Sequence, residues 1–389
     1  MSLRDLPDTK SRREALEQEI SAKLPHIAAY TPDLEIASTK NCENMIGAVQ
    51  VPLGIAGPLK WQMVDGEWRT VYLPLATTEG ALIASISRGC KAITESGGAI
   101  VHTHKVGMSR GPVFYTKSIR EGTRLWKFVK ENKEKIKSIA EATSGHLVFK
   151  DVLVKSLPNY TYLRFSYDTG DAMGMNMATI ATQAVVEFIE KETGIACLSV
   201  AGNFDVDKKP AWLTSIEARG TKAWAEIVLS KNVVEKVLKT TPQKFFDVWL
   251  AKVMLGSAVS GSMGFNAHIA NVIAAIFLAT GQDPAHVVEG SLGLTTAKVL
   301  ENGDLYVGVY LPALLVGTVG GGTNLPTQKE ALQILGVSGA EKVEEFAQIV
   351  VAACLAGEIS LLASLSEGSL ATAHKKLGRN SKSQILNSK

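Results

Sequence analysis

The hydrophobic and polar positions of this chain switch repeatedly between the period of a strand and the period of a helix. Residues 73–93 begin with extended spacing and continue with helical spacing, so we expect a helix there with Thr77 or Thr78 as its N-cap. Residues 100–117 alternate like a strand on either side of a turn, and residues 119–141 form a charged amphipathic helix pattern. The first third of the chain therefore predicts a mixture of strands and helices.

A compact module is predicted between about residues 112 and 200. After the strand and helix just described, residues 146–168 have the pattern of two strands and residues 179–194 that of a helix. Strand, helix, two strands and helix is the order of a split βαβ, or ferredoxin-like, module.

From about residue 203 onward the pattern is mostly helical. The predicted helices are residues 242–256, 263–280, 328–335 and 342–372, and one hairpin is expected over 295–311. Residues 11–24 predict a short amphipathic helix near the N-terminus. The pattern as a whole predicts an α+β fold, in which the β-rich module is inserted into a larger, mostly helical domain.

Length, composition and charge narrow the class of protein. The chain has 389 residues, of which 46% are hydrophobic and 20% charged, so it is too long for one ordinary core and too apolar to be disordered. Its net charge of +3 gives no footprint for nucleic acid. Residues 373–389 hold five basic and no acidic side chains, so the basic character is concentrated in this tail.

Neither export nor a membrane span is predicted. The N-terminal residues are charged throughout and form no signal peptide. The most apolar stretches, 269–279 and 349–356, are shorter than the roughly 18 apolar residues that a span needs, so we expect buried helices. The cysteines have no CxxC spacing, which argues against a disulfide framework and a zinc site. They are Cys42, Cys90, Cys197 and Cys354. We expect a cytoplasmic protein with no metal and no nucleic-acid or membrane partner.

Two glycine clusters permit close approach of a ligand. GDAMGMN (170–176) lies between a predicted strand and a predicted helix, where free backbone N–H groups suit a pyrophosphate, although a sharp corner that needs glycine explains it equally well. GTVGGGT (317–323) suits either an anion-binding nest or a flexible loop. The chain has neither GxGxxG after a strand nor GxxxxGKS/T, so a Rossmann site and a P-loop are not expected.

Three titratable groups are candidates for chemistry, and each has a simpler explanation. Lys208 in DVDKKP (205–210) suits a solvated turn, or a pocket in which it stabilises an oxyanion. Glu79 in TTEG suits the first turn of a helix, or a general acid if burial or a like charge favours its protonated form. His374 opens the basic tail, which is either a solvated terminus or a closing flap that carries an acid/base group. These residues indicate a phosphate-bearing ligand but no particular reaction.

Taken together, seven strings resemble the 3-hydroxy-3-methylglutaryl-CoA reductase family. In order they are ENMIGAVQVPLGIAGPL (43–59), LATTEG (75–80), GDAMGMNM (170–177), DKKP (207–210), GSMGFNAHIANV (261–272), GQD (281–283) and GTVGGGTNLP (317–326). The resemblance covers roughly residues 40–380 and is closer to the class that includes the eukaryotic and archaeal enzymes.

The resemblance implies a four-electron reduction of 3-hydroxy-3-methylglutaryl-CoA to mevalonate and free CoA. The family uses two NADPH and passes through a hemithioacetal and mevaldehyde, a step of isoprenoid biosynthesis in the mevalonate pathway. The alternative is the reverse reaction, the NAD-dependent oxidation of mevalonate in catabolism. A CoA-binding protein without catalysis is a further alternative, but the four residues that the family uses for catalysis are all present. They are Glu79, Lys208, Asp283 and His374.

Each catalytic type fits a step of this reaction. Lys208 would stabilise the oxyanion formed at the former carbonyl, and His374 would protonate the thiolate that leaves. Glu79 would donate a proton in the second reduction. Asp283, placed between Lys208 and Glu79, would keep the lysine charged and favour the protonated glutamate by like-charge repulsion.

The resemblance also implies binding residues and domain roles. Contacts to the substrate carboxylate and hydroxyl, and to CoA, are expected from Arg110, Lys209, Lys252, Asn271, Ser87, Arg88 and Lys91. Contacts to the dinucleotide are expected from Asp171, Met173, Gly174, Met175, Asn176, Gly321, Gly322 and Thr323. The implied domains are an N-terminal helical arm (1–30), a discontinuous CoA- and substrate-binding domain (31–110 and 202–372), a small NADP-binding domain (111–201) and a C-terminal basic flap (373–389).

Two positions depart from the family pattern. Ala201 stands where the animal enzymes have a serine before GN, so one substrate hydrogen bond is lost or replaced. Gly145 stands where relatives that select NADPH often have an arginine for the 2′-phosphate, and His146 or a tail lysine is a substitute. NADPH is the expected cofactor and NADH the alternative. The family assembles its active sites across a dimer interface, which implies a homodimer with shared sites and leaves higher oligomers open.

Overall fold

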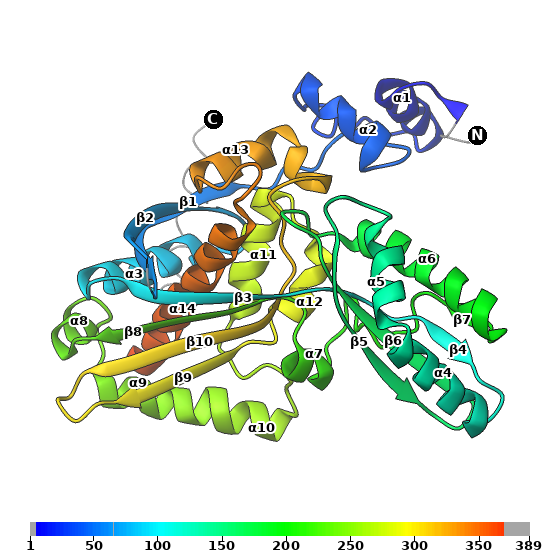
Figure 1. The fold of residues 1–389 in the computed structure, drawn as a ribbon. Coiled ribbons are helices and arrows are strands. Elements are labelled where there is room, and N and C mark those ends of the chain that lie inside the picture. The colour runs from blue at the N-terminus through cyan, green and yellow to red at the C-terminus, as the bar shows by residue number, and fades with distance from the viewer. Residues whose placement is uncertain (1–4, 65, 369–389) are drawn as a thin grey trace.

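Two regions of the fold share one long strand. The computed structural model describes residues 5–64 and 66–368, and among these residues ten strands join in one sheet. Strand β3 (Ala99–Arg110) crosses the middle of the molecule (Figure 1). Its earlier residues pair with β8 (Gly220–Leu229), whereas its last three, 108–110, pair with β6 (Tyr160–Asp168). Each region has its own hydrophobic cluster, so β3 connects two separately packed cores.

The larger region combines a sheet with a deeply buried helix. Its remaining strands are β1 (Leu53–Met63), β2 (Trp68–Ala76), β9 (Leu294–Val299) and β10 (Leu305–Leu314). Neighbouring strands run antiparallel except β1 and β3, which are parallel. Helix α3 (Leu82–Glu95) packs on β1, and helix α14 (Val343–Glu367) packs on α3, β8 and β10.

Helix α14 is the core of this region. Between Phe346 and Ser364 every residue except Leu361 is buried. An 18-residue window of α14 has a mean hydropathy of 2.0 and is apolar enough to cross a membrane, so the apolar run is longer than the sequence pattern predicted. However, 83% of that window is buried inside the protein, which is the environment of a core helix. The prediction of a buried helix over 349–356 is confirmed.

The smaller region has the predicted order of strand, helix, two strands and helix, followed by one short strand that was not predicted. Its strands β4 (Val113–Tyr115), β5 (Val148–Ser156), β6 and β7 (Cys197–Ser199) are antiparallel, in the order β7-β4-β6-β5. Its helices are α4 (Ile119–Glu131), α5 (Lys133–Glu141) and α6 (Met175–Thr193). The single helix expected over 119–141 is divided at Asn132, which ends α4 and precedes α5.

The larger region contains more strand than the sequence pattern predicted, although helices still make up more of it than strands. Strand β1 was not predicted, and of β2 only residues 73–76 fall in the extended spacing predicted there. The pairing of β1 with β2 shifts register between Ala56 and Leu59. Strand β8 shows clear alternation, with Ala223, Ala225 and Leu229 buried and the intervening side chains outward. The fold class is α+β, and the larger region contributes most of the sheet.

The remaining elements are short and lie around these two regions. They are α1 (Thr9–Glu19), η2 (Pro32–Ile36), α2 (Ala37–Lys40), α7 (Trp212–Glu217), α8 (Lys231–Lys236), α9 (Pro242–Val248), the π-helix η3 (Trp249–Gly256), α10 (Ser257–Ser260), α11 (Ile269–Thr280), η4 (Pro284–His286), α12 (Val287–Gly290), η5 (Gly321–Asn324) and α13 (Pro326–Ile334). Helix α1 starts after Asp8, whose carboxylate accepts the Ser11 N–H, and it ends before the predicted residue 24.

Candidate active site

Lys208 and Asp283, two of the predicted catalytic residues, form an ion pair. Lys208 lies in the loop between β7 and α7, and Asp283 follows α11 and accepts the Ala285 N–H at the start of η4. The Lys208 Nζ lies 2.8 Å from Asp283 Oδ2. This hydrogen bond raises the pKa of Lys208, because it stabilises the ammonium form. Burial opposes ionisation of Asp283, but the hydrogen bond from Lys208 prevails and the pKa of Asp283 is lowered.

The backbone of Lys208 adopts a left-handed conformation that a side chain disfavours. Its φ is +55°, and Asn203 and Val206 in the same loop also have positive φ. Such residues persist only where the surrounding structure holds them. The Lys208 N–H donates to Glu289 Oε1 at 2.7 Å, and the Glu289 side chain is fully buried. The loop between β7 and α7 that carries Lys208, here called the lysine loop, is therefore held in place by the buried Glu289 carboxylate.

Arg219 is the centre of a buried charge cluster beside this loop. Its guanidinium is fully buried and lies 2.9 Å from Asp207 Oδ1 and 2.9 Å from Glu289 Oε1. Its Nε donates to Ser109 Oγ at 2.9 Å, so Arg219 connects strand β3 to the lysine loop. The two carboxylates compensate the charge that burial would otherwise make very costly.

Arg110, a predicted substrate contact, belongs to the same cluster. Its NH1 lies 3.4 Å from Asp205 Oδ2 and 4.0 Å from Asp207 Oδ2. Burial raises the pKa of Asp205, although Arg219 and Arg110 oppose that change. Lys209 turns back to the Asp207 carbonyl at 3.2 Å. The structure thus brings Arg110 and Lys209 to the loop that carries Lys208.

The two predicted cofactor segments lie against each other. The Thr318 N–H donates to the Asp171 carbonyl at 2.9 Å, and a Cβ on Gly317 would lie 2.7 Å from the Met173 nitrogen, so the contact requires glycine. Gln282, which precedes Asp283, pairs its side-chain amide with Gly317: it donates to the carbonyl at 3.0 Å and accepts the N–H at 2.8 Å. The segment that contains Asp283 is therefore hydrogen-bonded to the glycine segment 317–323, and that segment contacts the other, 170–176.

Within the segment 170–176 the Asp171 carboxylate is occupied. It accepts the backbone N–H groups of residues 341–343 at 2.8, 3.0 and 3.1 Å, at the start of α14. Helix α6 begins at Met175 after Gly174, whose φ is +85°, and no side chain of the described residues caps its first N–H groups. Free amides at a helix start suit an anion. The Asp171 carboxylate is thus already bound within the protein, and the first N–H groups of α6 are the groups in this segment that suit an anion.

A cavity of about 660 Å³ lies beside α3 and is lined by Ser87, Arg88 and Lys91. This placement is expected for residues that contact the same ligand. The Arg88 guanidinium donates to the Ser360 Oγ at 3.1 Å and to the Ser360 carbonyl at 2.6 Å, so α14 holds it in place. Lys236 and Lys239 line the same cavity, and sequence reasoning missed both. The signal in the sequence that could have indicated them is that they are two lysines three residues apart, at the end of α8.

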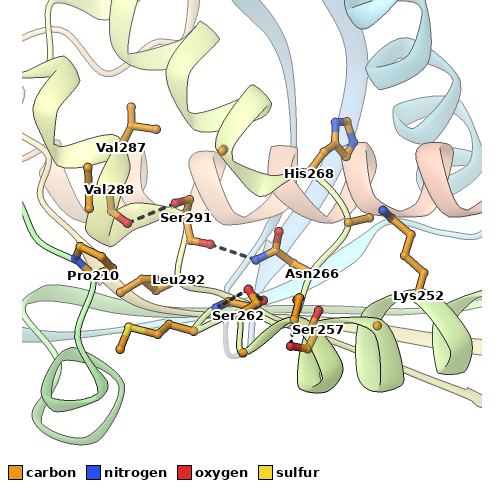
Figure 2. A pocket seen from close by; sticks show the side chains of 17 residues that line it. Pro210, Lys252, Ser257, Ser262, Asn266, His268, Val287, Val288, Ser291 and Leu292 are labelled. Carbon is orange, nitrogen blue, oxygen red and sulfur yellow. Dashed lines mark hydrogen bonds between the residues drawn. The ribbon is translucent and has the colours of Figure 1, made fainter.

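A larger cavity of about 1090 Å³ lies between the lysine loop and the π-helix η3. Lys252 and His268 line one side and Pro210, the last residue of DKKP, lines the opposite side (Figure 2). Glu358 of α14 fixes one wall, because its buried carboxylate accepts the N–H groups of Ala267 and His268 at 2.7 Å each. The lining residues include Lys252 but not Asn271, which lies in the first turn of α11.

Comparisons with known proteins match this arrangement to a family. The family model for hydroxymethylglutaryl-coenzyme A reductase matches residues 8–379. The chain belongs to the hydroxymethylglutaryl-coenzyme A reductase family. It is 50% identical over 372 residues to the 3-hydroxy-3-methylglutaryl-coenzyme A reductase of Methanothermobacter thermautotrophicus, covering 95% of this chain and 92% of that protein. It is 40% identical to reductase 1 of Dictyostelium discoideum over 95% of this chain and 68% of that protein.

A solved structure supports the fold of this reductase family member. The class II 3-hydroxy-3-methylglutaryl-CoA reductase of Streptococcus pneumoniae, bound to NADPH, aligns with a TM-score of 0.69 and 19% identity. The alignment covers 92% of this chain and 96% of that one. The predicted family is confirmed, and the archaeal relatives agree with the predicted class.

Glu79, a third catalytic candidate of the reductase, is not paired with Lys208 or Asp283 in the part of the chain that the structure describes. Helix α3 begins at Leu82 with Ala81, not Thr77 or Thr78, as its N-cap, so Glu79 lies in the preceding turn and not in the first helical turn. Within the described residues, the exposed Glu79 carboxylate forms no hydrogen bond or ion pair with Lys208 or Asp283. His374 lies outside the described residues. Both assignments remain predictions.

The two departures from the reductase pattern have identifiable surroundings. Nothing lies within 4 Å of a Cβ built on Gly145, and the His146 carbonyl lies 4.0 Å from a Cβ built on Gly170, beside the predicted dinucleotide segment. At Ala201 the side-chain hydroxyl is absent, but the Ser199 Oγ donates to the Ala201 carbonyl at 3.2 Å. Position 201 therefore keeps a neighbouring hydroxyl from another residue.

Sequence reasoning missed the residues that hold the site together. Arg219, Gln282 and Glu289 are buried and polar, and each bonds the backbone or side chain of a predicted site segment. Gln282 adjoins Asp283, and Glu289 lies six residues after it. Proximity to GQD was the only signal for Gln282 and Glu289, and Arg219 had none, since burial of a charged residue cannot be read from a single sequence.

Proposed function

We propose that this chain reduces 3-hydroxy-3-methylglutaryl-CoA to mevalonate and CoA with two equivalents of NADPH, in isoprenoid biosynthesis. Membership of the reductase family supports the overall reaction. The observation that carries the mechanism is the Lys208–Asp283 ion pair. Pro210, two residues after Lys208, lines the 1090 Å³ cavity, and Gln282, next to Asp283, bonds Gly317 of one glycine segment.

The residues present fit a dinucleotide. The uncapped start of α6 offers N–H groups to a pyrophosphate. The 317–323 segment contacts the preceding loop at Gly317, and a Cβ built on Gly320 or Gly321 would meet nothing within 4 Å. Met173, Gly174, Met175 and Asn176, together with 321–323, would hold the cofactor. When bound, NADPH supplies the reducing equivalents. Lys105 and Lys150 lie near the same segment, both paired with Asp168, and are candidate cations for a 2′-phosphate.

Lys208 acts where negative charge develops. Reduction of the thioester places charge on the former carbonyl oxygen, and a fixed ammonium stabilises that charge more than it stabilises the neutral substrate. Asp283 keeps Lys208 protonated by hydrogen bonding to the ammonium. The second reduction, of an aldehyde, again produces an alkoxide and uses the same lysine. Asp283 therefore maintains the charge on which both steps depend.

Two proton transfers complete the overall reaction, one to the CoA thiolate and one to the alkoxide formed from the aldehyde. The first product, a hemithioacetal, breaks its carbon–sulfur bond and releases the CoA thiolate, which His374 protonates. The aldehyde then becomes an alcohol, with Glu79 as the proton donor. Arg110, Lys209, Lys252 and Asn271 would bind the substrate carboxylate and hydroxyl, and the cavity at Ser87, Arg88 and Lys91 would hold CoA.

The domain roles and the assembly form part of the proposal. Residues 111–201 would bind the dinucleotide, and 31–110 with 202–372 would bind CoA and substrate. Residues 1–30 would form the N-terminal arm and 373–389 a flap. A homodimer with shared sites would bring residues of a second subunit to each centre, in a cytoplasmic enzyme.

The deciding experiment compares both cofactors in both directions. We expect NADPH to give the higher kcat/KM for reduction of 3-hydroxy-3-methylglutaryl-CoA, measured as nicotinamide absorbance loss with mevalonate identified as product. A marked preference for NAD in the oxidation of mevalonate would instead support the catabolic direction. No turnover with either cofactor would contradict the proposed activity itself.

A further inference from the structure

Glu289 has a role that the reaction described above leaves open. Its Oε1 has three donors around it: the Lys208 N–H at 2.7 Å, the Arg219 NH1 at 2.9 Å and the His286 Nδ1 at 3.3 Å. The side chain is 0% exposed. A carboxylate buried in this way is costly unless such partners compensate it. Its contacts therefore define what Glu289 does.

The same cluster has the outline of a metal site, but its centre already holds a positive charge. Ligand atoms of Asp207, His286 and Glu289 lie within 4.8 Å of one another. The Arg219 NH1 is 2.9 Å from a carboxylate oxygen of both acidic residues. A divalent cation between them would meet a guanidinium in direct repulsion. The cluster is better explained as an ion-pair network that supports the lysine loop.

Glu289 and Asp283 hold the two ends of the same lysine. Asp283 binds the Lys208 ammonium at 2.8 Å, and Glu289 binds the Lys208 backbone N–H at 2.7 Å. Asp283 is the N-cap of η4 and Glu289 lies in α12, which follows η4 directly, so the distance between the two contacts is fixed by a few residues of chain. The positive φ of Lys208 shows that its backbone needs such support.

We propose that Glu289 is a positioning residue that, together with Asp283, forms a two-point clamp on Lys208. The clamp sets where the ammonium lies relative to the oxygen that becomes negative. Arg219 completes the clamp, because it neutralises Glu289 and also approaches the Met175 Sδ at 3.7 Å, in the predicted dinucleotide segment. This inference rests on the proposed reduction. It predicts an effect on kcat, since the ammonium stabilises charge that appears only in the transition state.

Two conservative variants separate the hydrogen bond from the charge. Glu289→Gln keeps an oxygen at the same reach and removes the charge, whereas Glu289→Asp keeps the charge and withdraws the carboxylate by one methylene. We expect E289Q to retain kcat within about threefold and E289D to lose about 10- to 100-fold, as a misplacement of about 1 Å does. KM for the CoA substrate should change by less than about threefold in both variants. Thermal melting verifies that each variant is folded, and Glu289→Ala provides a third variant without the hydrogen bond.

A matched control tests whether any such hydrogen bond would give the same result. Glu190 accepts the Cys197 N–H at 2.7 Å in the smaller region, so Glu190→Asp removes an equivalent contact away from Lys208. We expect E190D to keep the wild-type kcat. Wild-type reduction is measured first: if it is absent, the proposed function fails. If it is present and E289D keeps the wild-type kcat, or if E289Q loses as much as E289D, the clamp is contradicted.

Discussion

Two neighbouring ion pairs in this protein differ in exposure, and the difference separates reactivity from stability. In the Lys208–Asp283 pair the side chains are 41% and 30% exposed, whereas in the Arg219–Glu289 pair both are 0% exposed. A partly exposed pair is screened by water and contributes about 0–1 kcal/mol to folding, but its ammonium can meet a substrate. A buried pair cannot meet a substrate, and loss of one partner leaves an uncompensated charge. The exposed pair is thus available for chemistry, and the buried pair keeps it in place.

The largest effect is expected when the exposed pair loses its lysine. Lys208→Ala should lower kcat for thioester reduction by at least about 10²- to 10³-fold, the usual result of removing a group that stabilises an oxyanion. Reduction of mevaldehyde should fall similarly, because both steps develop an alkoxide. The melting temperature should hardly change.

Lys133→Ala is a suitable control for that variant. Lys133 lies 2.7 Å from Asp151 in another exposed pair, on α5 and β5, and should keep its activity. Near-normal turnover of Lys208→Ala on either substrate would exclude Lys208 as the group that stabilises the oxyanion.

The buried pair should behave in the opposite way in a stability measurement. Arg219→Leu should lower the free energy of unfolding by about 3–5 kcal/mol, because Glu289 would remain charged and buried without its partner. Urea denaturation of Arg219→Leu against Lys208→Ala makes the comparison directly. The double variant Arg219→Leu/Glu289→Leu should recover part of the loss, since the orphaned charge is gone. Equal stability of the two single variants would contradict the division between the pairs.

The sequence allowed the exposed pair to be predicted, but not the buried one. Lys208 and Asp283 stand in short motifs that carry the family resemblance, and the 2.8 Å contact agrees with the expectation that Asp283 holds the lysine charged. Arg219 and Glu289 stand in segments without such motifs. Whether a charged residue is buried depends on how distant segments pack. The role of Arg219 therefore follows only from the folded structure, in which it contacts Ser109 of β3 and Asp207 of the lysine loop.

The fold shows the same limit. Alternation and helical spacing predicted the strands and helices of the smaller region in the correct order, because each has one clear buried face. In the larger region, Gly54, Gly57 and Pro58 interrupt the pattern of β1, and only the end of β2 was predicted. The alternation of β8 was present in the sequence but was not predicted as a strand. Asp171 illustrates the point at one residue: its motif predicts ligand binding, but its carboxylate binds the start of α14, which is more than 160 residues away in sequence.

A smaller effect should appear in the pH dependence of the exposed pair. The hydrogen bond that the Lys208 ammonium donates to Asp283 raises the pKa of Lys208 above its ordinary value, so the active ammonium form is present below that pKa and is lost as pH rises through it. In Asp283→Asn the negative charge is removed, the pKa of Lys208 falls, and the alkaline limb of kcat/KM should move to lower pH. The pH profiles of wild type and D283N, measured with saturating cofactor, test this, and Asp151→Asn should leave the limb unmoved. If the limb of D283N coincided with that of the wild type, the proton lost at high pH would not be that of Lys208, and the exposed pair would owe its role to geometry instead of charge.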